Sequence, residues 1–265
     1  MALELYHSNG SLCSQKVKLV LAEKNLEWKS HLINLLTFEN LQPKYIKINP
    51  KGVVPTLIHD GKVITDSVVI VRHIEEQFPH PRLILTEPRL QEKMNGWIEL
   101  QNKFPMRELM YGNYRGIEGL LLRRSVEIKE RLLPRLMQAN PELKEQYCAK
   151  LKDVRQWNST IQNAKEIENI NAEIKPMLDL LEEQLSQTDW LCGATYSLAD
   201  SVWTAVLSGL NELKFSHLWV GNTRPAIAAY FNRLQSRPSF DVAILGDEIP
   251  LPMLLAGLRR IFFGI

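Results

Sequence analysis

The sequence has few of the residues that build disulfide frameworks, metal centres or nucleic-acid surfaces. Three cysteines occur in 265 residues, and this odd, widely spaced set, Cys13, Cys148 and Cys192, excludes a disulfide framework and fits a reducing compartment. No group of cysteines and histidines has the spacing of a metal site, so we expect no bound metal. The net charge of +2 supplies no general attraction for nucleic acid. Composition alone therefore indicates an ordinary globular protein and no particular partner.

Long hydrophobic runs are absent as well. The opening MALELYHSNG lacks the basic flank and the apolar stretch of a secretory signal, so we expect a cytoplasmic protein. The most apolar stretch, Ile249–Ile265, is shorter than the roughly 20 residues of a membrane span and contains Arg259 and Arg260. We expect this tail to pack against its own protein, with a subunit contact or a membrane-surface segment as the alternatives.

The first eighty residues alternate between strand and helix patterns. A short strand candidate, Leu3–Tyr6, is followed by the turn-like Ser8-Asn9-Gly10 and then by apolar residues at helical spacing. The strongest hairpin signal is Asp60-Gly61 between two short strand candidates. Further strands are expected at 28–32, 56–58 and 62–64, and further helices at 39–46 and from 66 onward. The predicted order is βαβαββα, which is typical of an α/β thioredoxin-like domain.

Three prolines at 79, 81 and 88 interrupt this pattern, and the rest of the chain has helical periodicity. We therefore expect a linker over about 79–88, followed by an all-α helical bundle. Two helix starts are well marked, Asn140-Pro141 and the capping-box pattern Ser197-Leu198-Ala199-Asp200. The expected helices cover roughly 89–111, 118–137, 141–162, 172–185, 198–213 and 225–236.

Ser11-Leu12-Cys13-Ser14 lies between the first strand and the first helix, where unpaired backbone N–H groups and the helix dipole favour negative charge. The thioredoxin fold has a CxxC pair at this place, whereas serines occupy both positions here, so disulfide exchange is not expected. A serine hydroxyl still donates a hydrogen bond to a bound thiolate and lowers the pKa of the thiol. We therefore predict that Ser11 activates a thiol. Simple capping of the helix by these serines is the alternative.

Two further segments, Val54-Pro55 and Asp66-Ser67, fit an extended peptide ligand. A cis proline before the third strand lets Val54 offer its backbone N–H and C=O to the peptide; the alternative is an ordinary proline at a strand start. Asp66-Ser67 opens a helix whose N–H groups and hydroxyl suit a carboxylate, while the aspartate suits an ammonium group; the alternative is a plain cap. The three segments in this order, with a hairpin between the last two, form a specific combination.

With these residues the chain resembles the cytosolic glutathione transferases over nearly its whole length. The resemblance rests on four segments: Tyr6–Lys24, Asn49–Leu57 (NPKGVVPTL), Asp66–Ile70 and Tyr196–Asp200 (YSLAD). It implies a thioredoxin-like glutathione-binding domain at 1–80 and an all-α C-terminal domain at 89–246 that supplies the pocket for a hydrophobic electrophile. Glutathione would be the co-substrate.

The resemblance also assigns roles to the predicted site residues. Ser11 matches the activating serine of the serine-type enzymes, and Val54-Pro55 matches the backbone clamp on the tripeptide. Asp66-Ser67 matches the γ-glutamyl site, and Lys51 is expected to reach the glycine carboxylate. The family implies a homodimer, and no contact with nucleic acid is expected.

Within the family, the run SLCSQKV at Ser11–Val17 is similar to that of the plant tetrachlorohydroquinone-dehalogenase-like transferases and the ganglioside-induced differentiation-associated proteins. This subgroup implies a helical insertion at about 118–162 and a prolonged apolar tail at 247–265. The reaction implied is glutathione conjugation, reductive dehalogenation or peroxide reduction. A non-catalytic binding protein or a membrane-associated regulator is the alternative.

Two other residues compete with Ser11 for the activating role. Tyr6 corresponds to the hydroxyl of the tyrosine-type transferases, but it falls inside the first strand rather than just beyond it. Cys13 would be activated by the helix terminus if it were the nucleophile of a thiol transferase. Its position on the apolar side of the helix instead predicts a buried structural cysteine.

Overall fold

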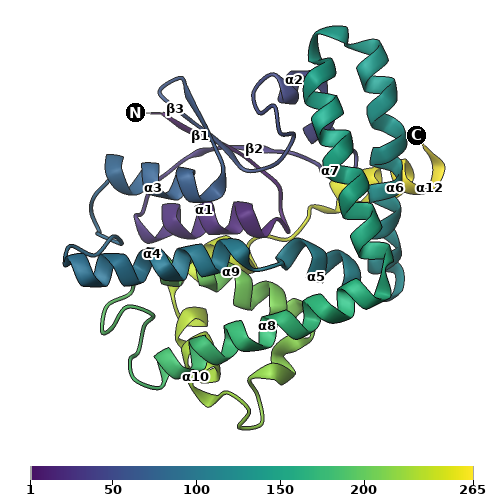
Figure 1. Ribbon diagram of the computed structural model, residues 1–265. Coiled ribbons are helices and arrows are strands. Elements are labelled where there is room, and N and C mark those ends of the chain that lie inside the picture. The colour runs from purple at the N-terminus through teal and green to yellow at the C-terminus, as the bar shows by residue number, and fades with distance from the viewer. Residues whose placement is uncertain (1, 265) are drawn as a thin grey trace.

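The computed structural model describes residues 2–264, and the N-terminal part of the chain forms a four-stranded mixed sheet (Figure 1). Its strands are arranged in the order β2-β1-β3-β4, with β1 parallel to β2 and antiparallel to β3. The predicted βαβαββα order and the thioredoxin-like class are confirmed. The strands are β1 (Leu3–His7), β2 (Lys29–Leu32), β3 (Thr56–His59) and β4 (Lys62–Thr65).

Helices α1 (Leu12–Glu23) and α3 (Ser67–Gln77) cover one face of the sheet, whereas the short α2 (Pro43–Ile46) lies on the other (Figure 1). Alternate strand residues point to the same face, so Leu5 of β1 and Leu57 of β3 share one core with Val17 of α1. This arrangement places the N-terminus of α1 and the N-terminus of α3 near the same end of the sheet.

The rest of the chain is helical and is centred on α9 (Leu198–Glu212), in which every residue from 198 to 210 is buried. The predicted all-α class of this part is confirmed. The other helices of this part are α4 (Pro88–Lys103), α5 (Met106–Asn113), α6 (Gly116–Ala139), α7 (Lys144–Gln162), α8 (Ala164–Leu185), α10 (Pro225–Gln235), α11 (Pro238–Phe240) and α12 (Leu251–Phe263). Short helical turns η1 (Glu39–Leu41), η2 (Pro141–Leu143), η3 (Phe215–Leu218) and η4 (Asp241–Leu245) complete the chain.

Three predicted helix limits are wrong. The predicted start at Asn140-Pro141 leads into the short turn η2, and α7 itself begins at Lys144. The helix expected over 89–111 is divided into α4 and α5 at Phe104-Pro105, because the residue before a proline disfavours helical geometry and the proline has no N–H to donate. The helix expected from 172 starts at Ala164 instead. Asn163 caps it by accepting hydrogen bonds from the N–H groups of Lys165 (3.1 Å) and Glu166 (3.3 Å).

Helices α6 and α7 form an antiparallel hairpin that rises beside the N-terminal domain (Figure 1). A second hydrophobic core lies between this hairpin and the segment around η1 and α2, and the Tyr147 hydroxyl donates to the Leu41 carbonyl at 2.9 Å. The hairpin therefore packs on the same domain that carries the predicted site. The buried residues of this core are Phe38, Leu41, Ile46, Val126, Leu133, Leu143, Tyr147, Leu151, Val154, Trp157 and Ile161.

The apolar tail crosses back to the N-terminal domain as α12 and lies against α6 and the segment after β2. The Asn34 side chain donates to the Met253 carbonyl at 2.9 Å, and Arg124 donates to the Ile261 carbonyl at 3.0 Å. A Cβ at Gly257 would overlap the side chain of Leu36, so glycine permits this close approach. Across residues 2–264, no helix has both the length and the apolar character needed to cross a membrane.

The predicted capping box at Ser197–Asp200 is confirmed, and it is wholly buried. The Leu191 N–H and the Tyr230 hydroxyl donate to one Asp200 oxygen (3.0 and 2.8 Å), while the Ser197 N–H and hydroxyl donate to the other (2.8 and 2.7 Å). Asp200 therefore connects the start of α9 both to α10, through Tyr230, and to the loop before α9, through Leu191.

We expect Asp200→Asn to lower the free energy of unfolding by about 2 kcal/mol, because an amide nitrogen would face buried donors and leave them without an acceptor. Urea unfolding followed by far-ultraviolet circular dichroism measures the change. The exposed Asp189→Asn is the matched control. Equal stability of the two variants would contradict this role for Asp200.

Candidate active site

One large cavity, of about 580 Å³, lies between the N-terminal domain and the helical part. Its lining brings together five of the six predicted site residues, Ser11, Val54, Pro55, Asp66 and Ser67. The sixth, Lys51, is exposed and lies outside the lining. The sequence markers therefore converge on one site, and Lys51 sits at its periphery.

Ser11 is the N-cap residue of α1 and borders the cavity. Its Oγ accepts a hydrogen bond from the Ser14 N–H at 3.3 Å, and the hydroxyl donates a hydrogen bond to no group among residues 2–264. Ser14 is fully buried, and its Oγ accepts from the Ser8 N–H at 3.3 Å, which fixes the loop before the helix. Ser11 therefore does cap the helix, as the alternative interpretation held. Capping uses only the oxygen of the hydroxyl and leaves its proton available to a ligand.

The Val54–Pro55 peptide is cis, as predicted. Val54 lies outside the strands, and neither its N–H nor its C=O has a hydrogen-bond partner within the described residues. The preceding turn is held firmly, because the Tyr45 hydroxyl and the Asn49 amide both donate to the Val53 carbonyl at 2.8 Å. Backbone groups of this kind, fixed in place and unpaired beside a cavity, are suited to pairing with an extended peptide.

Asp66 caps α3 with a positive φ of 76°, and one carboxylate oxygen accepts from the N–H groups of Val68 (2.9 Å) and Val69 (3.3 Å). The neighbouring Ser67 is buried at the first turn of the helix. Lys16 of α1 lines the same part of the cavity and is also buried. Burial lowers the pKa of Lys16, and the charges of Cys13 and Asp66 oppose that change. The part of the cavity next to the start of α3 therefore offers a ligand both an acidic group, Asp66, and a basic group, Lys16.

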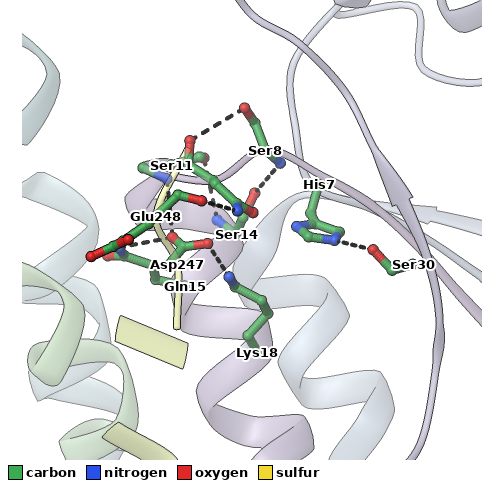
Figure 2. A network of polar contacts seen from close by, with 11 residues as sticks. His7, Ser8, Ser11, Ser14, Gln15, Lys18, Ser30, Asp247 and Glu248 are labelled. Atoms are coloured by element: carbon green, nitrogen blue, oxygen red, sulfur yellow. Dashed lines mark hydrogen bonds and ion pairs between the residues drawn. The ribbon is translucent and has the colours of Figure 1, made fainter. Parts of the chain in front are cut away.

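A contact between distant parts of the chain holds the loop before Ser11 (Figure 2). Asp247, in the segment that leads to α12, forms a buried ion pair with Lys18 and accepts from the Gly10 N–H and the Gln15 amide, both at 3.0 Å. The Asn9 side chain donates to the Glu248 carbonyl at 2.6 Å. Burial raises the pKa of Asp247, and the bond from Lys18 opposes this. The tail is therefore tied to the loop that carries Ser11.

Comparison with known families decides the assignment. The model of the glutathione S-transferase N-terminal domain matches residues 5–82, and that of the glutathione S-transferase C-terminal domain matches residues 152–238. Protein LigF of Sphingobium sp. strain SYK-6 is 30% identical over 90% of this chain and 91% of its own. The chain belongs to the glutathione S-transferase family.

The relatives of this glutathione S-transferase family member agree with the predicted subgroup. Tetrachloro-p-hydroquinone reductive dehalogenase of Sphingobium chlorophenolicum is 26% identical over 91% of this chain and 95% of its own. Glutathione S-transferase TCHQD of Arabidopsis thaliana is 23% identical over 91% and 89%. Ganglioside-induced differentiation-associated protein 1-like 1 of Homo sapiens is 26% identical over 93% and 74%. The crystal structure of the beta-etherase LigF from Sphingobium sp. strain SYK-6 has a TM-score of 0.73 at 25% identity, covering 93% of this chain and all of that one.

In this member of the glutathione S-transferase family, the structure corrects one expectation about the site. Cys13 is exposed and lines the cavity, whereas the sequence predicted a buried cysteine. It lies in the first turn of α1, on the side of the helix that faces the cavity rather than the core. Tyr6 stacks on His31 within the sheet, with the ring centroids 4.3 Å apart, and does not belong to the cavity lining.

Several residues of the site were not singled out from the sequence. Asn49 holds the turn before Val54, and it could have been predicted because it lies within the NPKGVVPTL motif. No sequence pattern could have predicted the role of Asp247, because its partners on α1 and the preceding loop lie more than 200 residues earlier in the chain. The cavity also extends to α5, α6 and α7, where it meets Arg107, Lys129 and Trp157.

Proposed function

We propose that this protein is a glutathione transferase that activates the glutathione thiol for attack on a hydrophobic electrophile. The observation that carries the proposal is the Ser11 hydroxyl at the edge of the cavity: its oxygen accepts from the Ser14 N–H, and its proton has no acceptor among residues 2–264. A hydroxyl in this state donates to a thiolate and lowers the pKa of the thiol, and the N-terminus of α1 adds a favourable dipole. Ser11 would be the catalytic residue.

The tripeptide is proposed to lie extended along the N-terminal domain. The backbone N–H and C=O of Val54, next to Pro55, would pair with the cysteinyl residue of glutathione. Asp66 and Ser67 would hold the γ-glutamyl end through charge and hydrogen bonds at the start of α3. Lys51 would reach the glycine carboxylate from outside the cavity.

The chemistry proposed is a nucleophilic displacement or addition by the thiolate. The thiol proton leaves to solvent, the sulfur forms a bond to the electrophilic atom, and in a displacement the leaving group departs with its electron pair. Holding the two reactants together in the cavity supplies much of the acceleration. Conjugation, reductive dehalogenation and peroxide reduction all begin with this thiolate. A homodimer and a cytoplasmic location belong to the same proposal.

The test is direct binding together with turnover. Glutathione binding is measured by calorimetry, and turnover is measured with a chloronitrobenzene, a halogenated hydroquinone and an organic hydroperoxide. We expect saturable glutathione binding and turnover of at least one of the three. Absence of both binding and turnover would overturn the proposal, and binding without turnover would favour a non-catalytic binding protein.

A further inference from the structure

The end of the cavity formed by α5, α6 and α7 contains a buried lysine for which the described part of the chain provides no counter-ion. Lys129 of α6 lines the cavity, and its side chain packs between aromatic rings, with Nζ 5.5 Å from the ring centroid of Trp157 and 5.9 Å from that of Phe38. The residue is 8% exposed, and its ammonium group has neither a hydrogen bond nor an ion pair with any group in residues 2–264. A buried ammonium group in this situation is costly unless something else neutralises it.

The charged groups around Lys129 do not supply that neutralisation. Asp153 of α7 is already shared, because it accepts from Arg107 at 3.1 Å and pairs with Lys150 at 3.5 Å. Glu108 pairs with Arg107 at 3.0 Å. Three cations therefore face two carboxylates at this end of the cavity, and the excess positive charge belongs to Lys129.

The walls beside this charge are aromatic. Tyr111 meets Trp157 edge to face, with ring centroids 4.4 Å apart, and the Arg107 guanidinium lies 4.9 Å from the Trp157 centroid. Burial is the main cause that lowers the pKa of Lys129 to about 7; the positive charges of Lys150 and Arg107 act in the same direction, and the charge of Asp153 opposes them. An anion bound here would restore the charged form of the lysine and would replace the missing counter-ion.

From this geometry we propose that the α5–α6–α7 end of the cavity binds an aromatic oxyanion, whose ring lies against Trp157 and Tyr111 and whose anionic oxygens pair with Lys129. Binding of the oxyanion does not depend on the proposed function, whereas its role as the second substrate does. The thiolate would then approach from the Ser11 end of the same cavity. The insertion, which also packs on the glutathione-binding domain, would thus select the electrophile.

Binding is tested without any turnover by calorimetry with 2-naphthoate and the isosteric neutral 2-naphthamide. We expect the wild-type protein to bind the naphthoate at least about tenfold more tightly, since a charge-assisted hydrogen bond contributes that much. Lys129→Met should abolish the preference, whereas the exposed control Lys152→Met on α7 should retain it. Equal affinity of the wild-type protein for the two probes, or a preference that survives Lys129→Met, would overturn the proposal.

Turnover separates this proposal from the proposed function. With glutathione, 4-chloro-3,5-dinitrobenzoate should show a lower KM than its methyl ester, and the difference should vanish in Lys129→Met. Turnover of both compounds with equal KM would leave the transferase activity standing and reject the anion site. Selective binding of naphthoate by a protein that turns over neither compound, and none of the three electrophiles named under the proposed function, would support the anion site and reject the enzyme.

Discussion

Replacing Ser11 with alanine should lower kcat/KM for glutathione-dependent turnover by about 100-fold. The reason is the loss of a hydrogen bond to an anionic sulfur, which is worth about 3 kcal/mol at the upper end of such bonds. The N–H of Ser14 would lose its acceptor at the same time, but this group lies at a helix N-terminus, where solvent or substrate can replace the serine oxygen.

The pH dependence gives a second readout for Ser11. If the hydroxyl lowers the pKa of the bound thiol, its removal raises that pKa, so the rate of Ser11→Ala should continue to rise at pH values where the wild-type rate is already constant. Glutathione affinity should change little, because Val54 and Asp66 carry the proposed binding contacts.

Two variants make the Ser11 result decisive. Ser236→Ala, at an exposed position after α10, should keep the wild-type rate and pH profile. Cys13→Ser tests the exposed thiol that shares the same helix turn. Full activity in Ser11→Ala together with its loss in Cys13→Ser would transfer the catalytic role from the serine to the cysteine.

The largest effect on stability is expected at Asp247. Asp247→Ala should lower the free energy of unfolding by about 3 to 5 kcal/mol, because it leaves the ammonium group of Lys18 buried without its partner. The two side chains of the pair are only 5% and 1% exposed. The Gly10 N–H and the Gln15 amide also lose their acceptor. Urea unfolding measures the change.

The neighbouring Glu248→Ala is the matched control, since its side chain is exposed and only its carbonyl bonds to Asn9. A double variant, Lys18→Met with Asp247→Leu, removes both charges and should recover much of the lost stability. If Asp247→Ala and Glu248→Ala were equally stable, the buried pair would have no role in holding the tail.

The parts of the structure that sequence patterns predicted are those encoded within short stretches of chain. The strand, turn and helix signals of the first eighty residues, and the capping box at Ser197–Asp200, depend on neighbours a few residues apart. The same holds for Ser11, Val54 and Asp66, because each lies at the end of an element and the sheet order then brings these ends together.

What the sequence did not predict depends on contacts between distant segments. Lys129 has the sequence context of a solvated helix residue, and it is buried only because α7 and the segment around Phe38 close over it. Cys13 was assigned to the wrong side of α1, since one turn of helix offers too few residues to define a face. The break at Pro105 was, in contrast, available from the sequence.

The hydrogen bonds that join Asp247 to α1 and to the loop before Ser11 have a consequence for folding during synthesis. Residues 247–263 leave the ribosome after every element that they fasten, so the sheet and α1 emerge long before their loop is secured. During synthesis the nascent chain therefore has its thioredoxin-like domain before it has the contacts that hold the Ser11 loop. The candidate site is therefore completed by a segment made more than 200 residues after Ser11, when the helices that enclose the cavity have already been synthesised.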